Sequence, residues 1–162
     1  MEPIIKNILQ IKLVGKNRQM SVANNQTALL WQEFAPIMKA HLSVKQPDLF
    51  SMEVYDNVDY FKAFDPQKTF TKWAAIKESD LKEVPEGLEA ISLNGLYACF
   101  TYKGRSSTAI PFYQYIYGQW LPQSDYVIDN RPHFALMGEQ YKNDDPASEE
   151  EICIPIKQSK GQ

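Results

Sequence analysis

The chain is poor in the residues that several functional classes require. Of its 162 residues only two are histidine and two are cysteine. The two histidines, His41 and His133, lie far apart in the sequence and do not form a zinc-binding spacing. A glycine-rich phosphate loop is absent, and no serine or cysteine is accompanied by the histidine and acid of a nucleophilic triad. We therefore expect no metal, no cofactor and no serine-type or cysteine-type catalysis.

A surplus of positive charge and long apolar runs are also missing. The chain has 17 basic and 20 acidic residues and a net charge of −3. Without a basic excess to neutralise phosphates, direct nucleic-acid binding is not expected. The apolar runs are only a few residues long, far short of a membrane span, and the first residues lack the pattern of a secretory signal. We expect a cytoplasmic protein that does not enter a membrane.

The two cysteines, Cys99 and Cys153, both lie within short apolar stretches that resemble strands. Free buried thiols in a reducing compartment are favoured over a disulfide. A catalytic thiol is not indicated, because neither cysteine has a histidine beside it in the sequence.

Aromatic residues are plentiful. Hydrophobic residues make up 44% of the chain, and 8 Phe, 9 Tyr and 3 Trp give an aromatic share of 12%. This composition predicts one folded domain over residues 1–162. Tyrosine has an apolar body and a polar tip, so an excess of it suits the walls of a binding pocket.

The first half of the chain predicts a strand, a helix and two further strands. A strand is expected over 6–14, with an extension past a bulge to Met20 left open. Apolar residues at helical spacing predict a helix that begins near Thr27, with Pro36 inside it. Two more strands are expected over 49–56 and 70–76.

The second half predicts the same order of elements. A strand broken at Asn94-Gly95 is followed by a helix that starts near Pro111 and is stopped by Pro122. Next comes a long strand interrupted by Pro132. The ranges expected for the three strands are 88–101, 126–141 and 149–157.

These two halves suggest an α+β fold built from two strand–helix–strand–strand repeats, over about 3–78 and 88–157. Two such units would share an antiparallel sheet and leave a cleft between their helices. Sequence identity between the halves is negligible, so the repeat rests on the order of the elements.

Candidate site residues follow from the strand and helix periods. Alternation places Glu151 on one face with Cys153 and Pro155, opposite a face of isoleucines that is expected to be core. Glu151 then faces either a cleft or solvent. In the second helix, Tyr113, Tyr117 and Trp120 share a stripe that is either core or pocket, and Tyr115 is expected to face solvent.

Trp31 and Phe34 lie on the apolar face of the first helix and are assigned to core packing or to ligand contact. His133 follows a proline in a strand, where a surface or hydrogen-bond-satisfied residue is favoured over a ligand to a metal or haem.

Several segments together resemble the GyrI-like family, also called the AraC-type effector-binding domain, which is related to ligand domains of multidrug regulators and to SOUL haem-binding proteins. The resemblance covers residues 3–157. Its segments are Leu30-Trp-Gln-Glu-Phe34, Leu93-Asn-Gly-Leu-Tyr-Ala-Cys-Phe100, Tyr115-Ile-Tyr-Gly-Gln-Trp-Leu-Pro-Gln-Ser124, Arg131-Pro-His-Phe134 and Glu151-Ile-Cys-Ile-Pro-Ile156.

The resemblance implies an aromatic cleft between two helices, with a glutamate that selects small hydrophobic or cationic molecules. By motif position that glutamate is Glu151. A second acid found in many members is replaced here by Ala135. With no room for a helix-turn-helix, a stand-alone binding domain is expected, in transcription regulation or toxin sensing. The ligand-binding set is Glu151, Tyr97, Tyr113, Tyr117, Trp120, Trp31, Phe34 and His133.

Two other functions remain open. Some stand-alone relatives hydrolyse strained electrophilic toxins, and Glu151 with Tyr97 would then supply acid–base chemistry. A protein-interaction module, which binds gyrase or a separate regulatory protein, predicts an exposed apolar patch and no deep cavity.

Overall fold

The structure is a computed structural model that describes residues 2–159. Within these residues, no helix combines the length and the apolar character that crossing a membrane requires. A π-helical turn, Ile116–Trp120, joins α2 (Ile110–Tyr115) to α3 (Leu121–Gln123). The elements are β1 (Ile4–Met20), α1 (Thr27–His41), β2 (Leu49–Val54), β3 (Phe70–Lys77), β4 (Glu89–Lys103), α2 (Ile110–Tyr115), α3 (Leu121–Gln123), β5 (Tyr126–Ile128), β6 (His133–Met137) and β7 (Glu149–Gln158). Short 3₁₀ turns lie at Val58–Phe61, Glu78–Asp80 and Ser106–Thr108.

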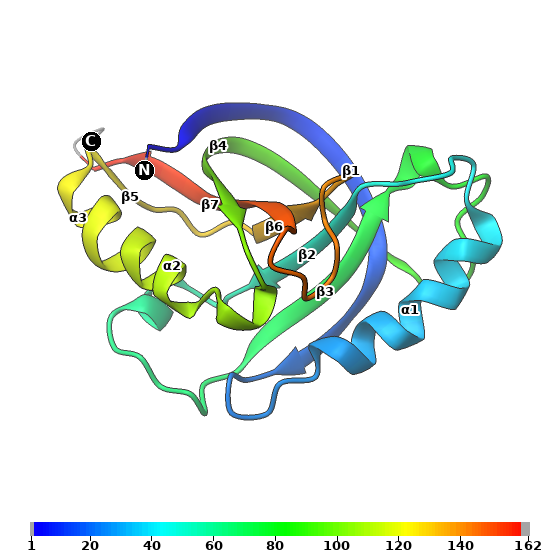
Figure 1. The fold of residues 1–162 in the computed structure, drawn as a ribbon, viewed down its shortest axis with the longest axis horizontal. Helices are drawn as coiled ribbons and strands as arrows, with labels where there is room; N and C mark the ends of the chain where they lie inside the picture. Colours follow the sequence, from blue (N-terminus) through cyan, green and yellow to red (C-terminus); the bar gives the residue numbers. More distant parts are fainter. Residues whose placement is uncertain (1, 160–162) are drawn as a thin grey trace.

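The seven strands of this described part form one antiparallel sheet in the order β4-β1-β3-β2-β6-β7-β5. Strand β4 also pairs with β7, so the sheet curls and closes on itself. Helices α1 and α2 lie well apart from each other, with strands β2 and β3 running between them in the view of Figure 1. The prediction of an α+β fold with an antiparallel sheet is confirmed.

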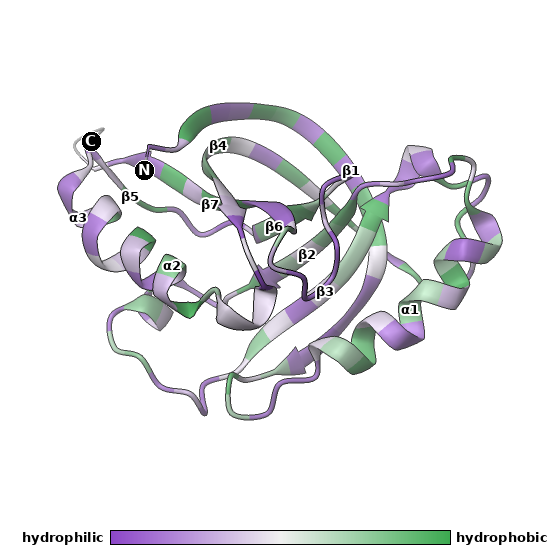
Figure 2. Ribbon diagram, in the orientation of Figure 1, coloured by the Kyte–Doolittle hydropathy of each residue, from purple (hydrophilic) through white to green (hydrophobic). Residues whose placement is uncertain are grey.

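The inner face of the closed sheet holds one of three hydrophobic clusters. Every strand of the closed ring contributes to it, because alternate side chains of each strand point inward. Hydrophobic and hydrophilic residues accordingly alternate along β1 (Figure 2). The buried members are Leu13, Phe50, Met52, Trp73, Ala75, Leu93, Tyr97, Cys99, Phe134 and Cys153.

The outer face carries the two helices, each over its own cluster. Helix α1 buries Leu30, Phe34 and Met38, which recur every four residues and form one apolar stripe. Helix α2 covers Ala98, Phe100 and the isoleucines of β7. The isoleucine face of the last strand is therefore core, as its alternation predicted.

Strand β1 is longer than the range 6–14 expected from the sequence. It reaches Met20, so it includes the extension past a bulge that the sequence had left open. The bulge lies at Leu9-Gln10, where the register with β4 shifts. At Gly15 the chain passes so close to β3 that an added Cβ would lie 2.0 Å from the Ala74 carbonyl oxygen. Strand β4 continues through Asn94-Gly95, where the sequence predicted a break. The strand is able to continue because Gly95 adopts a positive φ and because the extra residues of the bulge lie on β1.

The strand predicted over 126–141 with an interruption at Pro132 is present as two short strands, β5 and β6, which both pair with β7. The second of them ends at Met137, earlier than the predicted end at 141. The second helix differs from its prediction. It continues one residue beyond Pro122 to Gln123, and its middle is a π-helical turn rather than a regular α-helix.

Candidate functional site

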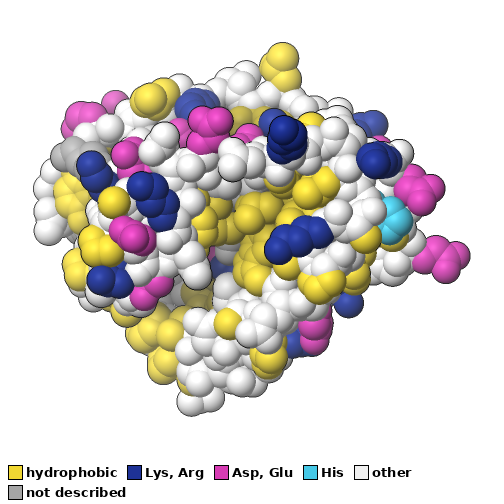
Figure 3. Space-filling view, turned by 45° about the vertical axis from the view of Figure 1, so that its right-hand side comes forward, with side chains coloured by type: hydrophobic (Ala, Val, Ile, Leu, Met, Phe, Trp, Pro, Cys, Tyr) yellow, Lys and Arg dark blue, Asp and Glu magenta, His cyan; other side chains and the backbone are white. Residues whose placement is uncertain are grey.

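A hollow of about 650 Å³ lies on the outer face of the sheet, bounded by residues of both helices. Its volume is in the range typical of small-molecule pockets. Figure 3 shows a hollow near the centre of the view, with hydrophobic side chains gathered inside. The lining of this α1–α2 hollow includes Thr27, Ala28, Trp31, Ser51, Glu53, Lys72, Ser106, Ala109, Tyr113, Ala135, Met137 and Glu150.

The sheet supplies the charged groups at the base of the hollow. Glu53 of β2 and Lys72 of β3 are register partners, so their side chains share the outer face. The Lys72 ammonium donates a hydrogen bond to the Glu53 carboxylate. The Lys72 side chain is only 10% exposed and that of Glu53 is 23% exposed. This pair is therefore shielded from water on most sides.

Glu150, near the start of β7, is the second carboxylate of the hollow. It lies on the same face as Ile152 and is half-buried. Burial raises the pKa of this carboxyl, against the opposing hydrogen bond from Ser106 and the charge of Lys72. The Ser106 hydroxyl lies 3.5 Å from the carboxylate. With Glu53, the hollow thus holds two acids and one base.

Two aromatic side chains form opposite walls of the hollow. Trp31 of α1 packs edge-on against Phe34, with ring centroids 5.9 Å apart. Tyr113 of α2 faces it across the sheet. Burial, with the Glu53 charge second, raises the pKa of Tyr113 well above its usual value. Its phenol therefore remains protonated and available as a hydrogen-bond donor.

An aromatic cluster around His133 lies beside this site. Phe61 stacks on both Tyr117 and His133, with centroid distances of 5.3 and 5.2 Å. The Tyr117 hydroxyl and His133 Nδ1 are 3.2 Å apart. His133 is only 4% exposed. It is thus a hydrogen-bond-satisfied histidine, one of the two alternatives favoured above.

Acid should destabilise the protein through His133. Burial, with Arg131 second, lowers the pKa of this imidazole to about 3. The unfolded chain takes up the proton below about pH 6.5, whereas the folded chain resists it down to about pH 3. The free energy of unfolding should therefore fall by about 1.4 kcal/mol for each pH unit across this window.

Urea unfolding at several pH values between 7 and 4 measures this effect. His133→Gln retains an acceptor for Tyr117 but does not titrate, so its stability should fall less steeply with acid than that of the wild type. Equal slopes for wild type and His133→Gln would contradict the assignment.

The structure places Glu151 away from the α1–α2 hollow. It lies on the inner face of the sheet, with Cys153, and Lys6 donates to both of its carboxylate oxygens at 3.1 and 2.9 Å. Tyr97 also points inward and is fully buried. The Tyr97 hydroxyl donates to the Pro132 carbonyl at 2.7 Å. Neither residue lines the hollow.

The other predicted site residues divide between the hollow and the surrounding core. Trp31 and Tyr113 line the hollow. Phe34 is fully buried beneath α1, and Trp120 stacks on Tyr126 at the far end of the second helix. Tyr113, Tyr117 and Trp120 all pack against the hydrophobic cluster beneath the second helix, as their shared stripe predicted, although a π-helical turn lies within that helix.

Tyr115 departs from its prediction. It packs against the cluster beneath α2 instead of facing solvent.

Sequence reasoning missed the two carboxylates of the hollow, Glu53 and Glu150. A signal for Glu150 was present, since strand alternation puts it on the isoleucine face that supports α2. Ala135 lines the same hollow. The position for which the resemblance implied a second acid thus faces the hollow, but here it brings only a methyl group.

Comparison with known proteins agrees with this architecture. A family model described as the GyrI-like small molecule binding domain matches residues 1–157. SAV2435 bound to tetraphenylphosphonium has a similar structure, with a TM-score of 0.68 and 15% identity over 97% of this chain and 94% of that one. A search of curated proteins gave no match.

Two further structures extend the comparison. EcmrR in a DNA complex has a TM-score of 0.68 and 15% identity over 97% of this chain and 57% of its own. A hydrolase from Listeria innocua has a TM-score of 0.59 and 9% identity over 96% and 92%. At such identities these likenesses show the fold alone. The family match, which spans nearly the whole sequence, shows that the chain belongs to the GyrI-like small-molecule-binding domains.

Proposed function

We propose that this domain binds an organic cation with apolar groups in the α1–α2 hollow. The observation that carries the proposal is the charge of the site. Glu53 and Glu150 bring two carboxylates to the hollow, and Lys72 balances only one of them. A ligand cation supplies the missing positive charge, which favours ionised Glu150 in spite of its burial.

The aromatic walls of the hollow contribute affinity for ligands of different shapes. Ring faces attract cations by about 0.5–2 kcal/mol. Apolar ligand surface contributes about 25 cal/mol for each Å² removed from water. Trp31 and Tyr113 offer both effects from opposite sides. Such a site suits lipophilic cations as a class.

The family supports this proposal, because its members are small-molecule-binding domains. SAV2435, whose fold is similar, was solved with tetraphenylphosphonium, a cation surrounded by aromatic groups. EcmrR, also similar in fold, was solved in a complex with DNA. We extend the proposal to sensing: ligand binding here would report a toxic cation, directly or through a separate regulatory protein.

The finer arrangement of the fold fits the same proposal. Strand β1, helix α1 and strands β2 and β3 make one half, and β4, α2 and the later strands make the other. We propose that the halves are two copies of one unit, and that the hollow is the cleft between their helices. Glu53 and Glu150 would then occupy the charge-selecting role expected of Glu151, one from each half.

Replacing one wall tests the location of the site. Trp31→Ala should weaken tetraphenylphosphonium binding about tenfold, since it removes both apolar surface and a ring face. Isothermal titration calorimetry measures the affinity. Trp120→Ala is the matched control, because that ring stacks on Tyr126 outside the hollow. An unchanged affinity for Trp31→Ala, or an equal loss in both variants, would place the ligand elsewhere.

Hydrolysis of an electrophile is the second candidate, and one observation favours it. Glu53 and Tyr113 line the same hollow, and burial, with the Glu53 charge second, raises the pKa of Tyr113, so a carboxylate shares the hollow with a protonated phenol. A base beside a hydrogen-bond donor is the minimum that general acid–base catalysis needs. Mass spectrometry of a bound electrophile distinguishes turnover, which requires Glu53, from simple binding.

The hypothesis of a protein-interaction module is less favoured. It predicted no deep cavity, whereas the α1–α2 hollow has a volume of about 650 Å³.

A further inference from the structure

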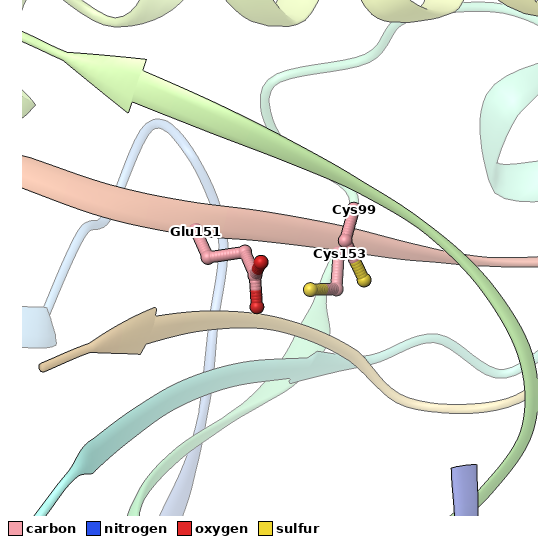
Figure 4. Close-up of side chains that lie close together, drawn as sticks. All are labelled: Cys99, Glu151 and Cys153. Atoms are coloured by element: carbon pink, nitrogen blue, oxygen red, sulfur yellow. The ribbon is translucent and has the colours of Figure 1, made fainter. Parts of the chain in front are cut away.

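Two cysteines and a glutamate meet on the inner face of the closed sheet. Cys99 of β4 and Cys153 of β7 are register partners in adjacent antiparallel strands. Glu151 precedes Cys153 by two residues, so its side chain leaves the strand on the same side. The two sulfur atoms and a carboxylate oxygen all lie within 4.8 Å of one another. Figure 4 shows the three side chains gathered between the strands.

Lys6 of β1 completes this group. Its ammonium donates to both oxygens of Glu151. Both cysteines are free and buried, whereas the Glu151 side chain is 24% exposed. The group thus combines two sheltered sulfur atoms with a carboxylate that reaches the rim.

We propose that Cys99, Cys153 and Glu151 form a binding site for a thiophilic divalent metal ion of the zinc class. Thiolate and carboxylate are both ligands of this class of ion, at about 2.3 and 2.0–2.2 Å respectively. Ligand atoms around one such ion lie about 3.5–4 Å apart, so the present spacing requires only small side-chain rotations. Water supplies the fourth ligand, from the exposed side of Glu151.

The charges of the four side chains suit a divalent ion. Two thiolates neutralise the ion, the Glu151 carboxylate adds one negative charge, and the Lys6 ammonium cancels it. A neutral assembly lowers the cost of placing an ion in the interior of the protein. Lys6 also orients the carboxylate through its hydrogen bonds, as partners of metal ligands commonly do.

An ion has a route to this site. A hollow of about 250 Å³ lies beside Glu151 and is lined also by Thr101, Leu136 and Glu139. The Lys6 side chain, which pairs with Glu151, is itself 42% exposed. Binding converts both thiols to thiolates, and the two protons pass to solvent. No electron is transferred.

Titration of the reduced protein with Cd²⁺ tests the proposal, with a phosphine reductant present and two free thiols confirmed beforehand. A sulfur-to-cadmium charge-transfer band should rise and saturate at one ion per chain, with release of two protons into a weakly buffered indicator solution. Cys99→Ala and Cys153→Ala should each weaken binding by about 100-fold or more, because each removes a ligand. Lys6→Met should weaken it by about 10–100-fold through loss of the oriented carboxylate.

Glu139→Gln is the matched control, since it removes an acid from the same rim hollow but not from the ligand set. It should leave the band and the affinity unchanged. No saturating band in a protein that retains both thiols, or equal affinity in wild type and Cys153→Ala, would overturn the proposal. Circular dichroism of each metal-free variant separates lost binding from lost folding. The outcome is independent of cation binding in the α1–α2 hollow.

Discussion

Replacing both Glu53 and Glu150 with glutamine is expected to lower the affinity for tetraphenylphosphonium by about 1000-fold or more. The cation carries its charge inside four phenyl groups, so each carboxylate acts on it from a distance. Unit charges about 8 Å apart at an effective dielectric constant of about 20 interact by about 2 kcal/mol. Two such losses give the stated factor, because about 1.4 kcal/mol corresponds to tenfold. The unpaired Lys72 then adds repulsion.

Glu151→Gln is the decisive control for this variant. It removes one negative charge from the same chain, but from the inner face of the sheet where Glu151 pairs with Lys6. Calorimetric titration should show affinity close to that of the wild type. If Glu151→Gln instead abolishes binding and the double variant retains it, the ligand does not use the α1–α2 hollow.

Replacing Arg131 with methionine is expected to lower the free energy of unfolding by about 3 kcal/mol, the lower end of the range for breaking a buried charged pair, because the Arg131 side chain is 19% exposed. The guanidinium donates to three backbone carbonyls, those of Asn94, Leu96 and Ile156, at 2.6, 2.7 and 2.9 Å. It also pairs with Asp129 at 2.7 Å and lies 4.9 Å from the centroid of the Tyr97 ring. Methionine leaves these acceptors without that donor.

Arg18→Met provides the comparison, because Arg18 forms an ion pair with Glu33 at 2.8 Å near the surface. Exposed pairs of this kind contribute about 0–1 kcal/mol. Chemical denaturation of the two variants under the same conditions measures the difference. Similar losses of unfolding free energy in the two variants would show that the contacts of Arg131 with β4 and β7 do not stabilise the fold.

Much of the fold followed from sequence period and turn residues. The apolar stripe of α1 was visible as Leu30, Phe34 and Met38, and the proline between β5 and β6 was visible as an interruption in one long strand. These features depend on residues close together in the chain. The closure of the sheet through β4 and β7 was not predicted, because it depends on pairing between segments about fifty residues apart.

The same limit explains the outcome for the candidate site. Trp31 and Tyr113 were named from helix periodicity, and they line the hollow. Glu53 and Glu150 lie on strands that are far apart in the sequence and come to one hollow only through long-range strand pairing. Sequence periodicity alone therefore did not identify them. Glu151 was selected by a family motif, and a shift of one residue along a strand moves a side chain to the opposite face of the sheet.

The central claim is that the α1–α2 hollow selects for positive charge. Calorimetric titration of the wild-type protein with tetraphenylphosphonium and with tetraphenylborate tests it most directly, because the two ions share their shape and differ in the sign of their charge. Two acids against one base in the hollow predict that the cation binds at least about 100-fold more tightly. Equal affinities, or tighter binding of the borate, would contradict the account.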